Sequence, residues 1–280
     1  MINSVGIVGQ GFVGTAVNAG LSKYFRVETF DIIPEKCTVG SLTELYHKTD
    51  VIFVCLPTPM RKSGECDISI VDNVLSKLNS LGKEKIVILK STVPPGTCES
   101  LQEKYDNIDL VFNPEFLTEA NAINDFIHQD RIVLGGKSKL ALSESYEMFR
   151  KAFRDVPIIK TDTKSAEMVK YITNCFLSVK VAFANQIFDI CSSIGIDYGT
   201  VSSIAKIDKR LGDSHWKVPG PDGDRGYGGH CFPKDMSAFL YFCETNGIDQ
   251  SIIRESIKYN DKIRIDRNWE NMVGRAVSDD

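Results

Sequence analysis

Short apolar runs alternate with amphipathic segments over about the first 160 residues. Seven of these runs predict β-strands, at 4–8, 26–30, 51–55, 86–90, 109–113, 131–135 and 157–161. Apolar residues at helical spacing predict helices between them, ending near 22 and covering 41–47, 68–81, 97–105 and 139–153. Strands that alternate with helices in this way are typical of an α/β fold with a Rossmann-type, doubly wound parallel sheet.

The pattern changes after 162. Residues 163–194 contain neither Gly nor Pro, and apolar residues recur at helical spacing from Met168 to Ile187. A helix of about 30 residues would be about 45 Å long. We expect it to join a nucleotide-binding domain, residues 1–162, to a smaller all-helical domain, residues 163–280. Later segments predict helices at 235–245 and 250–265, and a docked tail at 269–280.

Composition limits the classes of function. The chain is 42% hydrophobic and 25% charged, which is ordinary for a soluble protein. Its 33 basic and 37 acidic residues give a net charge of −4 without a basic run, which argues against nucleic-acid binding. No secretory signal pattern and no uninterrupted apolar stretch of about 20 residues is present, so we expect a cytoplasmic protein with no membrane contact.

The cysteines give no sign of a disulfide framework or a metal centre. All eight are scattered along the chain, without Cys-x-x-Cys pairs and without the spacing of metal ligands. We therefore expect eight reduced thiols and no metal site.

A glycine turn follows the first predicted strand, in the order Gly9-Gln10-Gly11-Phe12-Val13-Gly14. In a dinucleotide-binding turn the first glycine permits the tight bend, the second lets pyrophosphate approach the backbone, and the third lets helix and strand pack. Asp31 ends the second strand, where a carboxylate accepts the ribose hydroxyls and repels a 2′-phosphate. This context favours NAD over NADP, and it favours a cofactor site over a purely structural glycine turn.

Marked loops follow the next three strands. They comprise residues 56–59, 91–97 and 113–121, and all three contain proline. A proline can serve only to end a strand. In a parallel sheet, however, ligands bind beyond the carboxyl ends of the strands, so three such loops together indicate a binding site.

One thiol has unusual neighbours. Residues 226–235 read Gly-Tyr-Gly-Gly-His-Cys-Phe-Pro-Lys-Asp, so three glycines within four residues precede Cys231. Glycine lets the backbone approach a ligand closely, and His230 and Lys234 are cationic groups that would activate the thiol. The alternative is a buried structural cysteine before a helix. Lys170 and Asn174 share one face of the long helix. They would act with Cys231 only if the chain brings Cys231 back to that face, and the alternative is that both side chains are simply solvated.

In this order, the motifs resemble those of the nucleotide-sugar 6-dehydrogenases, most closely the UDP-glucose dehydrogenase branch. The matching stretches are the glycine turn, Pro57-Thr58-Pro59, residues 91–97, residues 113–117, the helix with Lys170 and Asn174, and residues 228–235. The family normally continues into a third, C-terminal domain that supplies part of the UDP site, and this chain stops before it. Two departures are Ala120-Asn121, where the family often has Gly, and a longer loop at 218–225.

The resemblance implies residue roles. It implies a catalytic set with Cys231 as nucleophile, Asp235 as its acid–base partner, Lys170 and Asn174 as oxyanion donors, Thr92 positioning water and Glu115 acting in hydrolysis. It implies cofactor contacts at Gly9, Gly11, Phe12, Val13, Gly14, Asp31, Lys36, Thr58, Thr92, Glu119 and Lys234. Substrate contacts are expected at Phe116, Leu117, Lys170, Asn174, Tyr227 and Gly228.

The implied reaction is the NAD-dependent, four-electron oxidation of a nucleotide-sugar C6 alcohol to the acid, with UDP-glucose giving UDP-glucuronate through a thiohemiacetal and a thioester on Cys231. The resemblance also implies a homodimer built around the long helix. Two alternatives stay open: a β-hydroxyacid dehydrogenase, which stops after one hydride, and a catalytically silent NAD-binding regulatory protein. The base and the sugar of the substrate also stay open.

Overall fold

The computed structural model describes residues 2–82 and 84–279. The chain divides into two compact units, one of Met1–Thr58 and Ile68–Lys170 and the other of Pro59–Asp67 and Tyr171–Asp280. These units differ from the expected domains in two places. The long helix contributes its first two turns to the first unit, and the short segment 59–67 belongs to the second.

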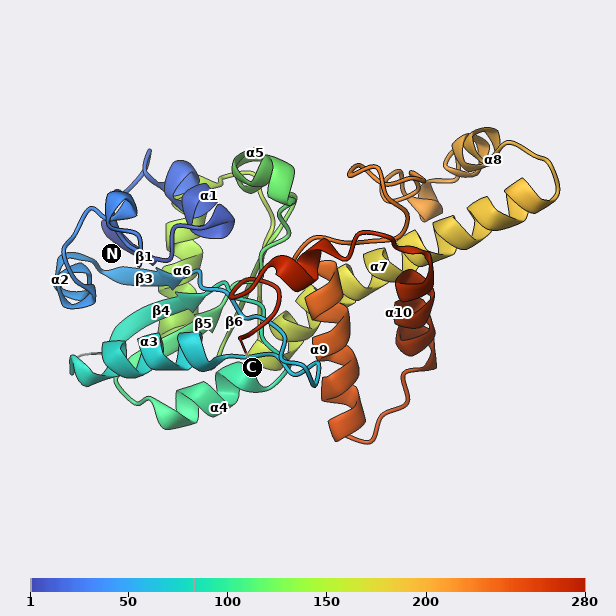
Figure 1. Cartoon of the computed structure of the whole chain (residues 1–280). Helices are drawn as coiled ribbons and strands as arrows, with labels where there is room; N and C mark the ends of the chain where they lie inside the picture. The colour runs from blue at the N-terminus through green and yellow to red at the C-terminus, as the bar shows by residue number, and fades with distance from the viewer. Residues whose placement is uncertain (1, 83, 280) are drawn as a thin grey trace. The chain divides into compact units, whose positions relative to one another are not determined.

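The first unit contains a seven-stranded sheet within its described residues (Figure 1). Its strands are β1 (Ser4–Val8), β2 (Arg26–Phe30), β3 (Val51–Val54), β4 (Lys85–Leu89), β5 (Ile108–Phe112), β6 (Ile132–Gly136) and β7 (Ile158–Thr161). They lie in the order β2-β1-β3-β4-β5-β6-β7. The order reverses between β1 and β3, and ligands of doubly wound sheets bind at such a switch point.

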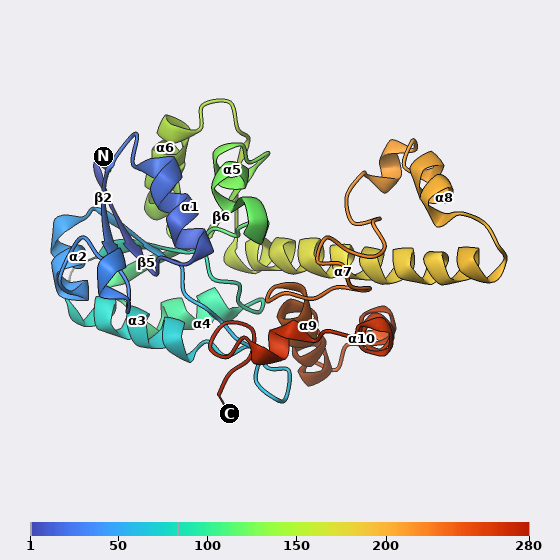
Figure 2. The same ribbon diagram turned by 45° about the horizontal axis from the view of Figure 1, so that its top comes forward.

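Helices cover both faces of this sheet (Figure 2). They are α1 (Phe12–Leu21), α2 (Leu42–Lys48), α3 (Ser69–Ser80), α4 (Thr97–Lys104), α5 (Ala122–Ile127) and α6 (Lys139–Ala152), with short 3₁₀ turns η1 (Pro34–Lys36) and η2 (Glu119–Asn121). One apolar core joins α1, α5 and α6 to the sheet, and a second joins α2, α3 and α4. All four residues of β3 are buried, as expected for a strand covered on both faces.

Two strands, β6 and β7, run against the expected direction, because β7 pairs parallel with β6. The fold class is confirmed, but β6 pairs antiparallel with β5, with Val111 opposite Gly136 and Phe112 opposite Gly135. The alternating pattern predicts the strands, whereas direction depends on how the connection crosses the sheet. Here η2 and α5 follow β5, and the chain then returns along the β5 edge in the opposite direction.

The helix α7 (Thr163–Ser193) is continuous. By length and composition alone it is apolar enough to cross a membrane, a criterion that the core helix of a soluble protein also meets. Glu167 and Lys170, near its beginning, are buried and bound to polar groups of the first unit. Such satisfied contacts are those of a helix packed inside a folded domain.

The described part of the second unit is mainly helical. It continues from α7 into α8 (Tyr198–Ala205), η3 (Lys209–Leu211), α9 (Phe232–Thr245), α10 (Ser251–Ile263) and η4 (Asn268–Asn271). Tyr171 of α7 stacks on Phe239 of α9. The predicted docking of the tail is confirmed for residues up to 279, because Met60 N donates to Ala276 O (2.8 Å) and Ser278 N donates to Met60 O (2.9 Å).

Candidate functional site

The glycine turn after β1 has the tight geometry predicted for it. Gly9 has a φ of 90°, in the left-handed region that glycine adopts without strain. A Cβ on Gly14 would lie 1.8 Å from the Gly9 carbonyl oxygen, so no larger residue fits there. These two glycines are therefore required by the packing of the protein itself.

Gly11 differs from its two neighbours. A Cβ on Gly11 would meet no heavy atom of the described residues within 4 Å. Gly11 caps the beginning of α1, whose first turn holds Phe12 and Val13 and has neither a side-chain cap nor an acidic residue. The open space and the helix N-terminus suit the close approach of an anionic group such as pyrophosphate.

Asp31 and Lys36 both bind the glycine turn. Asp31 Oδ2 accepts a hydrogen bond from Gln10 N at 2.5 Å, and its Oδ1 accepts one from Ile33 N at 2.9 Å. Lys36 Nζ donates to Gln10 O at 2.9 Å. The carboxylate at the end of β2 is thus fixed beside the turn, where the sequence predicts the ribose contact.

The loops after β3 and β4 are joined by hydrogen bonds. Thr58 Oγ1 donates to Thr92 O at 2.7 Å, and Leu56 N donates to Ser91 Oγ at 3.0 Å. Thr58 and Thr92 are both buried. The two predicted cofactor contacts therefore belong to one rigid edge of the sheet.

Glu115 and Lys170 form a buried ion pair. Lys170 Nζ donates to Glu115 Oε1 and to the Glu115 carbonyl oxygen, each at 2.7 Å, and Glu115 Oε2 accepts from Leu117 N at 2.8 Å. Burial alone would raise the pKa of Glu115, but the Lys170 ammonium and these hydrogen bonds outweigh it and lower the pKa. Two residues 55 positions apart in sequence, both predicted as catalytic, are thus in direct contact.

Two buried residues beside this pair, Lys90 and Asn113, are not among the site residues predicted from the sequence, although Asn113 begins one of the marked loops. Lys90 follows β4, is 3% exposed, and donates to Asn113 Oδ1 at 2.8 Å. Asn113 in turn donates through Nδ2 to Val133 O at 2.7 Å. Burial lowers the pKa of Lys90 to about 8, while the Glu115 carboxylate opposes this shift. A lone lysine after a strand gives no signal of this kind in the sequence.

Phe116 lies at the margin of this cluster, and Glu119 follows three residues later. The Arg131 guanidinium lies 4.0 Å from the centre of the Phe116 ring, and the Lys170 ammonium lies 6.0 Å from it. Glu119 is exposed at the beginning of η2. Arg131 thereby fixes the orientation of an aromatic ring that the sequence predicts to contact substrate.

Cys231 is the N-cap residue of α9, which begins at Phe232, three residues earlier than the sequence predicts. It is half-buried, whereas six of the other seven cysteines are buried, and none of the eight, all of which the structure describes, forms a disulfide. A helix N-terminus favours a negative charge on a nearby group. The predicted nucleophile therefore has both partial access to solvent and a favourable helix end.

The first turn of α9 carries a buried polar cluster. Asp235 is 1% exposed, accepts from Asn174 Nδ2 at 2.5 Å through Oδ2, and accepts from Lys234 Nζ at 2.5 Å through Oδ1. Burial alone would lower the pKa of Lys234, but Asp235, with smaller contributions from Cys66 and Cys231, raises it. Asn174, Asp235, Lys234 and Cys231 are thus brought together within the second unit.

The glycines before Cys231 serve mainly to admit protein side chains. A Cβ on Gly226 would lie 2.3 Å from Asn260 Oδ1, and one on Gly228 would lie 2.4 Å from Arg264 Nη2. This corrects the expectation that these glycines clear a path for a ligand. Only at Gly229, with a φ of 72°, would a Cβ meet no described atom within 4 Å.

Two family descriptions match the chain in order. Residues 38–153 match the NAD-binding domain of the UDP-glucose/GDP-mannose dehydrogenase family, and residues 164–262 match its central domain. The chain belongs to this family. Its first unit therefore contains the family's NAD-binding domain, and the open space at Gly11 fits that cofactor.

Curated relatives support this assignment. The UDP-glucose 6-dehydrogenase of Rickettsia bellii is 36% identical over 222 residues, covering 76% of this chain and 49% of that protein. The UDP-glucose 6-dehydrogenase TuaD of Bacillus subtilis is 36% identical over 228 residues, covering 78% and 47%. The chain spans about half the length of these relatives.

Solved structures agree on the fold. A UDP-glucose dehydrogenase from Pyrobaculum islandicum matches with a TM-score of 0.86 and 28% identity, over 94% of this chain and 68% of that one. The 3-hydroxyisobutyrate dehydrogenase of Mycobacterium tuberculosis matches with a TM-score of 0.75 and 16% identity, over 94% of both chains. The second similarity shows a shared fold alone.

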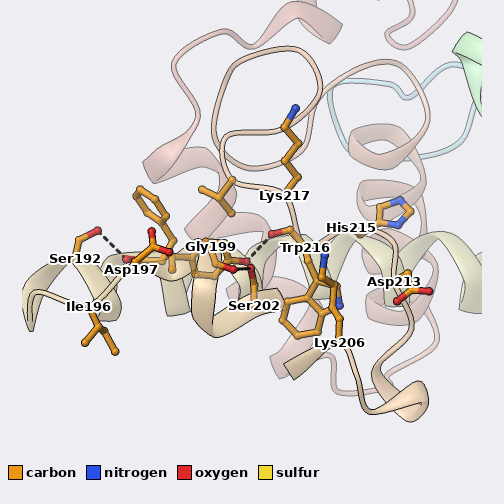
Figure 3. Close-up of a pocket in the computed structure, with 13 residues that line it drawn as sticks. Ser192, Ile196, Asp197, Gly199, Ser202, Lys206, Asp213, His215, Trp216 and Lys217 are labelled. Atoms are coloured by element: carbon orange, nitrogen blue, oxygen red, sulfur yellow. Dashed lines mark hydrogen bonds between the residues drawn. The ribbon is translucent and has the colours of Figure 1, made fainter. Parts of the chain in front are cut away.

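A pocket of about 620 Å³ lies elsewhere in the family's central domain, between the end of α7, α8 and the loop 213–218 (Figure 3). Trp216 lines it, and the Trp216 carbonyl oxygen accepts from Tyr198 Oη at 2.5 Å. None of the site residues predicted from the sequence lines this pocket.

Proposed function

We propose that this protein catalyses the NAD-dependent, four-electron oxidation of the C6 alcohol of a nucleotide sugar, with UDP-glucose as substrate. The observation that carries the proposal is a half-buried thiol at a helix N-terminus beside a buried Asn174–Asp235–Lys234 cluster. A dehydrogenase that stops after one hydride needs no nucleophilic thiol, whereas one that oxidises the aldehyde further can hold it covalently on a thiol. Relatives named UDP-glucose 6-dehydrogenase support the choice of substrate.

The first half of the mechanism makes and captures an aldehyde. NAD, when bound, accepts one hydride from the substrate carbon in each oxidation. The alcohol loses its hydroxyl proton and a hydride to become an aldehyde, and Asp235 serves as the acid–base partner in the proton transfers. The Cys231 thiolate then adds to the aldehyde carbon. Lys170 and Asn174 donate hydrogen bonds to the resulting oxyanion, and each such donor is worth about 2.7–4 kcal/mol.

The second half releases the acid. Loss of a second hydride from the thiohemiacetal leaves a thioester on Cys231. Glu115, with Thr92 positioning the water, assists attack on the thioester carbon, and the carbon–sulfur bond breaks to return the thiol. The pKa of Glu115 is lowered, which keeps this residue ionised as a base requires.

Glu115→Gln tests this division of roles. A neutral amide cannot take a proton from water, so thioester hydrolysis should slow while both hydride transfers remain possible. We expect a burst of about two NADH per active site and a substrate-sized adduct on Cys231, measured by intact mass and peptide mapping. Cys231→Ala should form neither the adduct nor the acid.

The same experiment separates the alternatives. A β-hydroxyacid dehydrogenase would form one NADH per substrate, and a silent NAD-binding protein would form none. An adduct on another cysteine, or acid formation by Cys231→Ala at a near-normal rate, would refute the nucleophile. A small panel of UDP- and GDP-sugars, assayed for NADH, identifies the substrate.

The proposed active protein is a cytoplasmic homodimer that binds neither nucleic acid nor membrane. Support for the dimer comes from one face of α7, where four large apolar side chains are 49–65% exposed: Ile172, Phe176, Phe183 and Ile190. Ile194, the residue after the helix, is also 65% exposed. Such a contiguous apolar surface is unusual on a monomer. The net charge of −4 and the absence of a basic run support the exclusion of nucleic acid.

A further inference from the structure

The loop before Cys231 is held from outside its own sequence by two asparagines. Asn260, in the last turn of α10, is 2% exposed. Its Oδ1 accepts from Tyr227 N at 2.7 Å, and its Nδ2 donates to Tyr227 O at 3.0 Å. Asn268, at the beginning of η4, accepts from Gly229 N at 3.0 Å. One side chain thus satisfies both backbone groups of Tyr227, as a neighbouring strand would, and a second fixes Gly229.

The glycines match these contacts. Gly226 leaves room for Asn260 Oδ1, and Gly228 leaves room for both Arg264 Nη2 and Asn268 Oδ1, which would lie 2.4 and 2.9 Å from a Cβ. The three-glycine sequence and the two asparagines therefore form one complementary arrangement. Asn268 lies beyond the part of the chain that matches the family's central domain, residues 164–262.

Arg264 anchors the other end of the same loop. It is 5% exposed, its Nη1 donates to Arg225 O at 3.3 Å, and its Nη2 pairs with Asp222 Oδ2 at 2.5 Å. Residues 222–229 are thus bound at successive points by α10 and the turn after it. Only one residue, His230, separates Gly229 from Cys231, so the anchored backbone leaves the thiol little freedom to move.

We propose that Asn260 and Asn268 are positioning residues for Cys231, because they fix the backbone of Tyr227 and Gly229 and thereby set where the thiol lies at the start of α9. This inference rests on the proposed function only for the role of Cys231 as nucleophile. Placement matters because a displacement of about 1 Å in a reacting group can cost about 100-fold in rate.

The first test measures placement without turnover. Cys231 and Cys37 are the two half-buried thiols, and the other six are buried, so the rate of iodoacetamide alkylation at Cys231 relative to Cys37 carries its own internal reference. Asn260→Asp keeps the acceptor for Tyr227 N but turns the donor toward Tyr227 O into a second acceptor. Asn268→Ala removes the acceptor for Gly229 N. We expect both variants to lower the ratio about tenfold, as the thiol leaves the helix end that favours its reactive thiolate.

The second test measures the consequence in the reaction. A misplaced thiol captures less aldehyde, so aldehyde released per NADH, trapped with a hydrazine, should rise about tenfold, equivalent to about 1.4 kcal/mol of barrier. This ratio does not depend on the amount of folded protein. Asn268→Asp keeps an acceptor for Gly229 N and should restore both ratios, and Asn271→Ala, at an exposed position of η4, should leave them unchanged.

The outcomes are distinct. If Asn260→Asp and Asn268→Ala keep both ratios within about twofold of the wild type, the inference is overturned, even if their melting temperatures fall, because the asparagines then act only on stability. Acid formation by Cys231→Ala would overturn the proposed function instead. The alkylation ratios would still show whether the two asparagines set the position of the Cys231 thiol.

Discussion

Lys90 is a charged residue whose burial should be visible in the pH dependence of stability. Its folded pKa is about 8 because burial disfavours the ammonium form, against a reference value of 10.5. Between these values the unfolded chain binds more protons at Lys90 than the folded chain does. The free energy of unfolding should therefore rise with pH across this window, by a maximum of about 3 kcal/mol.

Lys90→Met should abolish that rise, because it removes the titrating group. Denaturant unfolding from about pH 7 to pH 10.5 gives the free energy of unfolding of both proteins. Subtracting the variant from the wild type removes the contribution of the thiols, which titrate in both proteins. Lys77→Met, at an exposed position of α3, should keep the wild-type slope. A variant at Lys90 with an unchanged slope would contradict the assignment.

Asp31 should decide the choice of dinucleotide. Its carboxylate is fixed by hydrogen bonds from Gln10 N and Ile33 N, so it cannot turn away from a 2′-phosphate. We expect kcat/KM with NAD to exceed that with NADP by about 100-fold, and Asp31→Ser to reduce this preference to less than about tenfold. Equal efficiency of the wild type with both cofactors would refute the prediction.

At the scale of single residues, the sequence identifies side chains that belong to motifs and misses those that support them. Gly9 and Gly14 are predictable because their spacing follows a strand, and the structure shows the contacts that exclude a Cβ at each. Asn260 gives no such signal. It lies 33 residues after Tyr227 in an amphipathic helix, and its role depends on tertiary packing alone.

Among the elements, α4 depends on a carboxylate from another helix. Glu167 of α7 is fully buried and accepts from Gly96 N at 2.6 Å and Cys98 N at 2.8 Å, at the N-terminus of α4. Burial raises its pKa, although these hydrogen bonds oppose the shift. A helix N-terminus needs such acceptors for its first N–H groups.

Glu167→Ala should therefore lower the free energy of unfolding by about 2 kcal/mol, since it leaves two backbone donors without this acceptor. Denaturant unfolding measures the loss. Glu103→Ala, at an exposed position of the same helix, serves as the control and should change stability by less than about 0.5 kcal/mol. Equal effects of the two variants would show that Glu167 is not a cap.

Element type is well predicted by periodicity here, whereas direction and exact ends are not. Strands such as β4 and helices such as α6 lie within one residue of their predicted bounds, because apolar spacing reports burial directly. The direction of β6 depends on a connection that carries no such period. The sequence predicts α9 from residue 235, whereas the helix begins at Phe232, because Pro233 is compatible with the first turn of a helix.

Over the whole molecule, the sequence predicts two parts but not their composition. Segment 59–67 follows β3 and reads as a loop of the sheet, yet Met60 bonds to residues 276 and 278. Hydrogen bonds between residues more than 200 positions apart produce no local pattern in the sequence from which they could be predicted. The residues that the family resemblance implies as catalytic, in contrast, follow from ordered motifs, and two contacts among them, Glu115–Lys170 and Asn174–Asp235, exist within the units.

The assembly of the molecule can be tested on the exposed apolar face of α7. Phe176 is 65% exposed on that face. If two copies bury it against each other, a charge there must be desolvated without a partner, which costs several kcal/mol and disfavours the dimer. We expect the wild type to be a dimer at micromolar concentration by light scattering, and Phe176→Glu to have about half that mass.

Leu140→Glu is the matched control for this prediction. Leu140 is 66% exposed, on α6 of the first unit, so it changes the same kind of side chain to the same extent outside the α7 face. Its mass should equal that of the wild type. A monomeric wild type would refute the dimer outright, whereas a dimer that survives Phe176→Glu would place the interface on another surface. Association stabilises the folded state by mass action, so the melting temperature of a dimeric wild type should rise with protein concentration. The melting temperature of a monomeric Phe176→Glu variant should not depend on concentration.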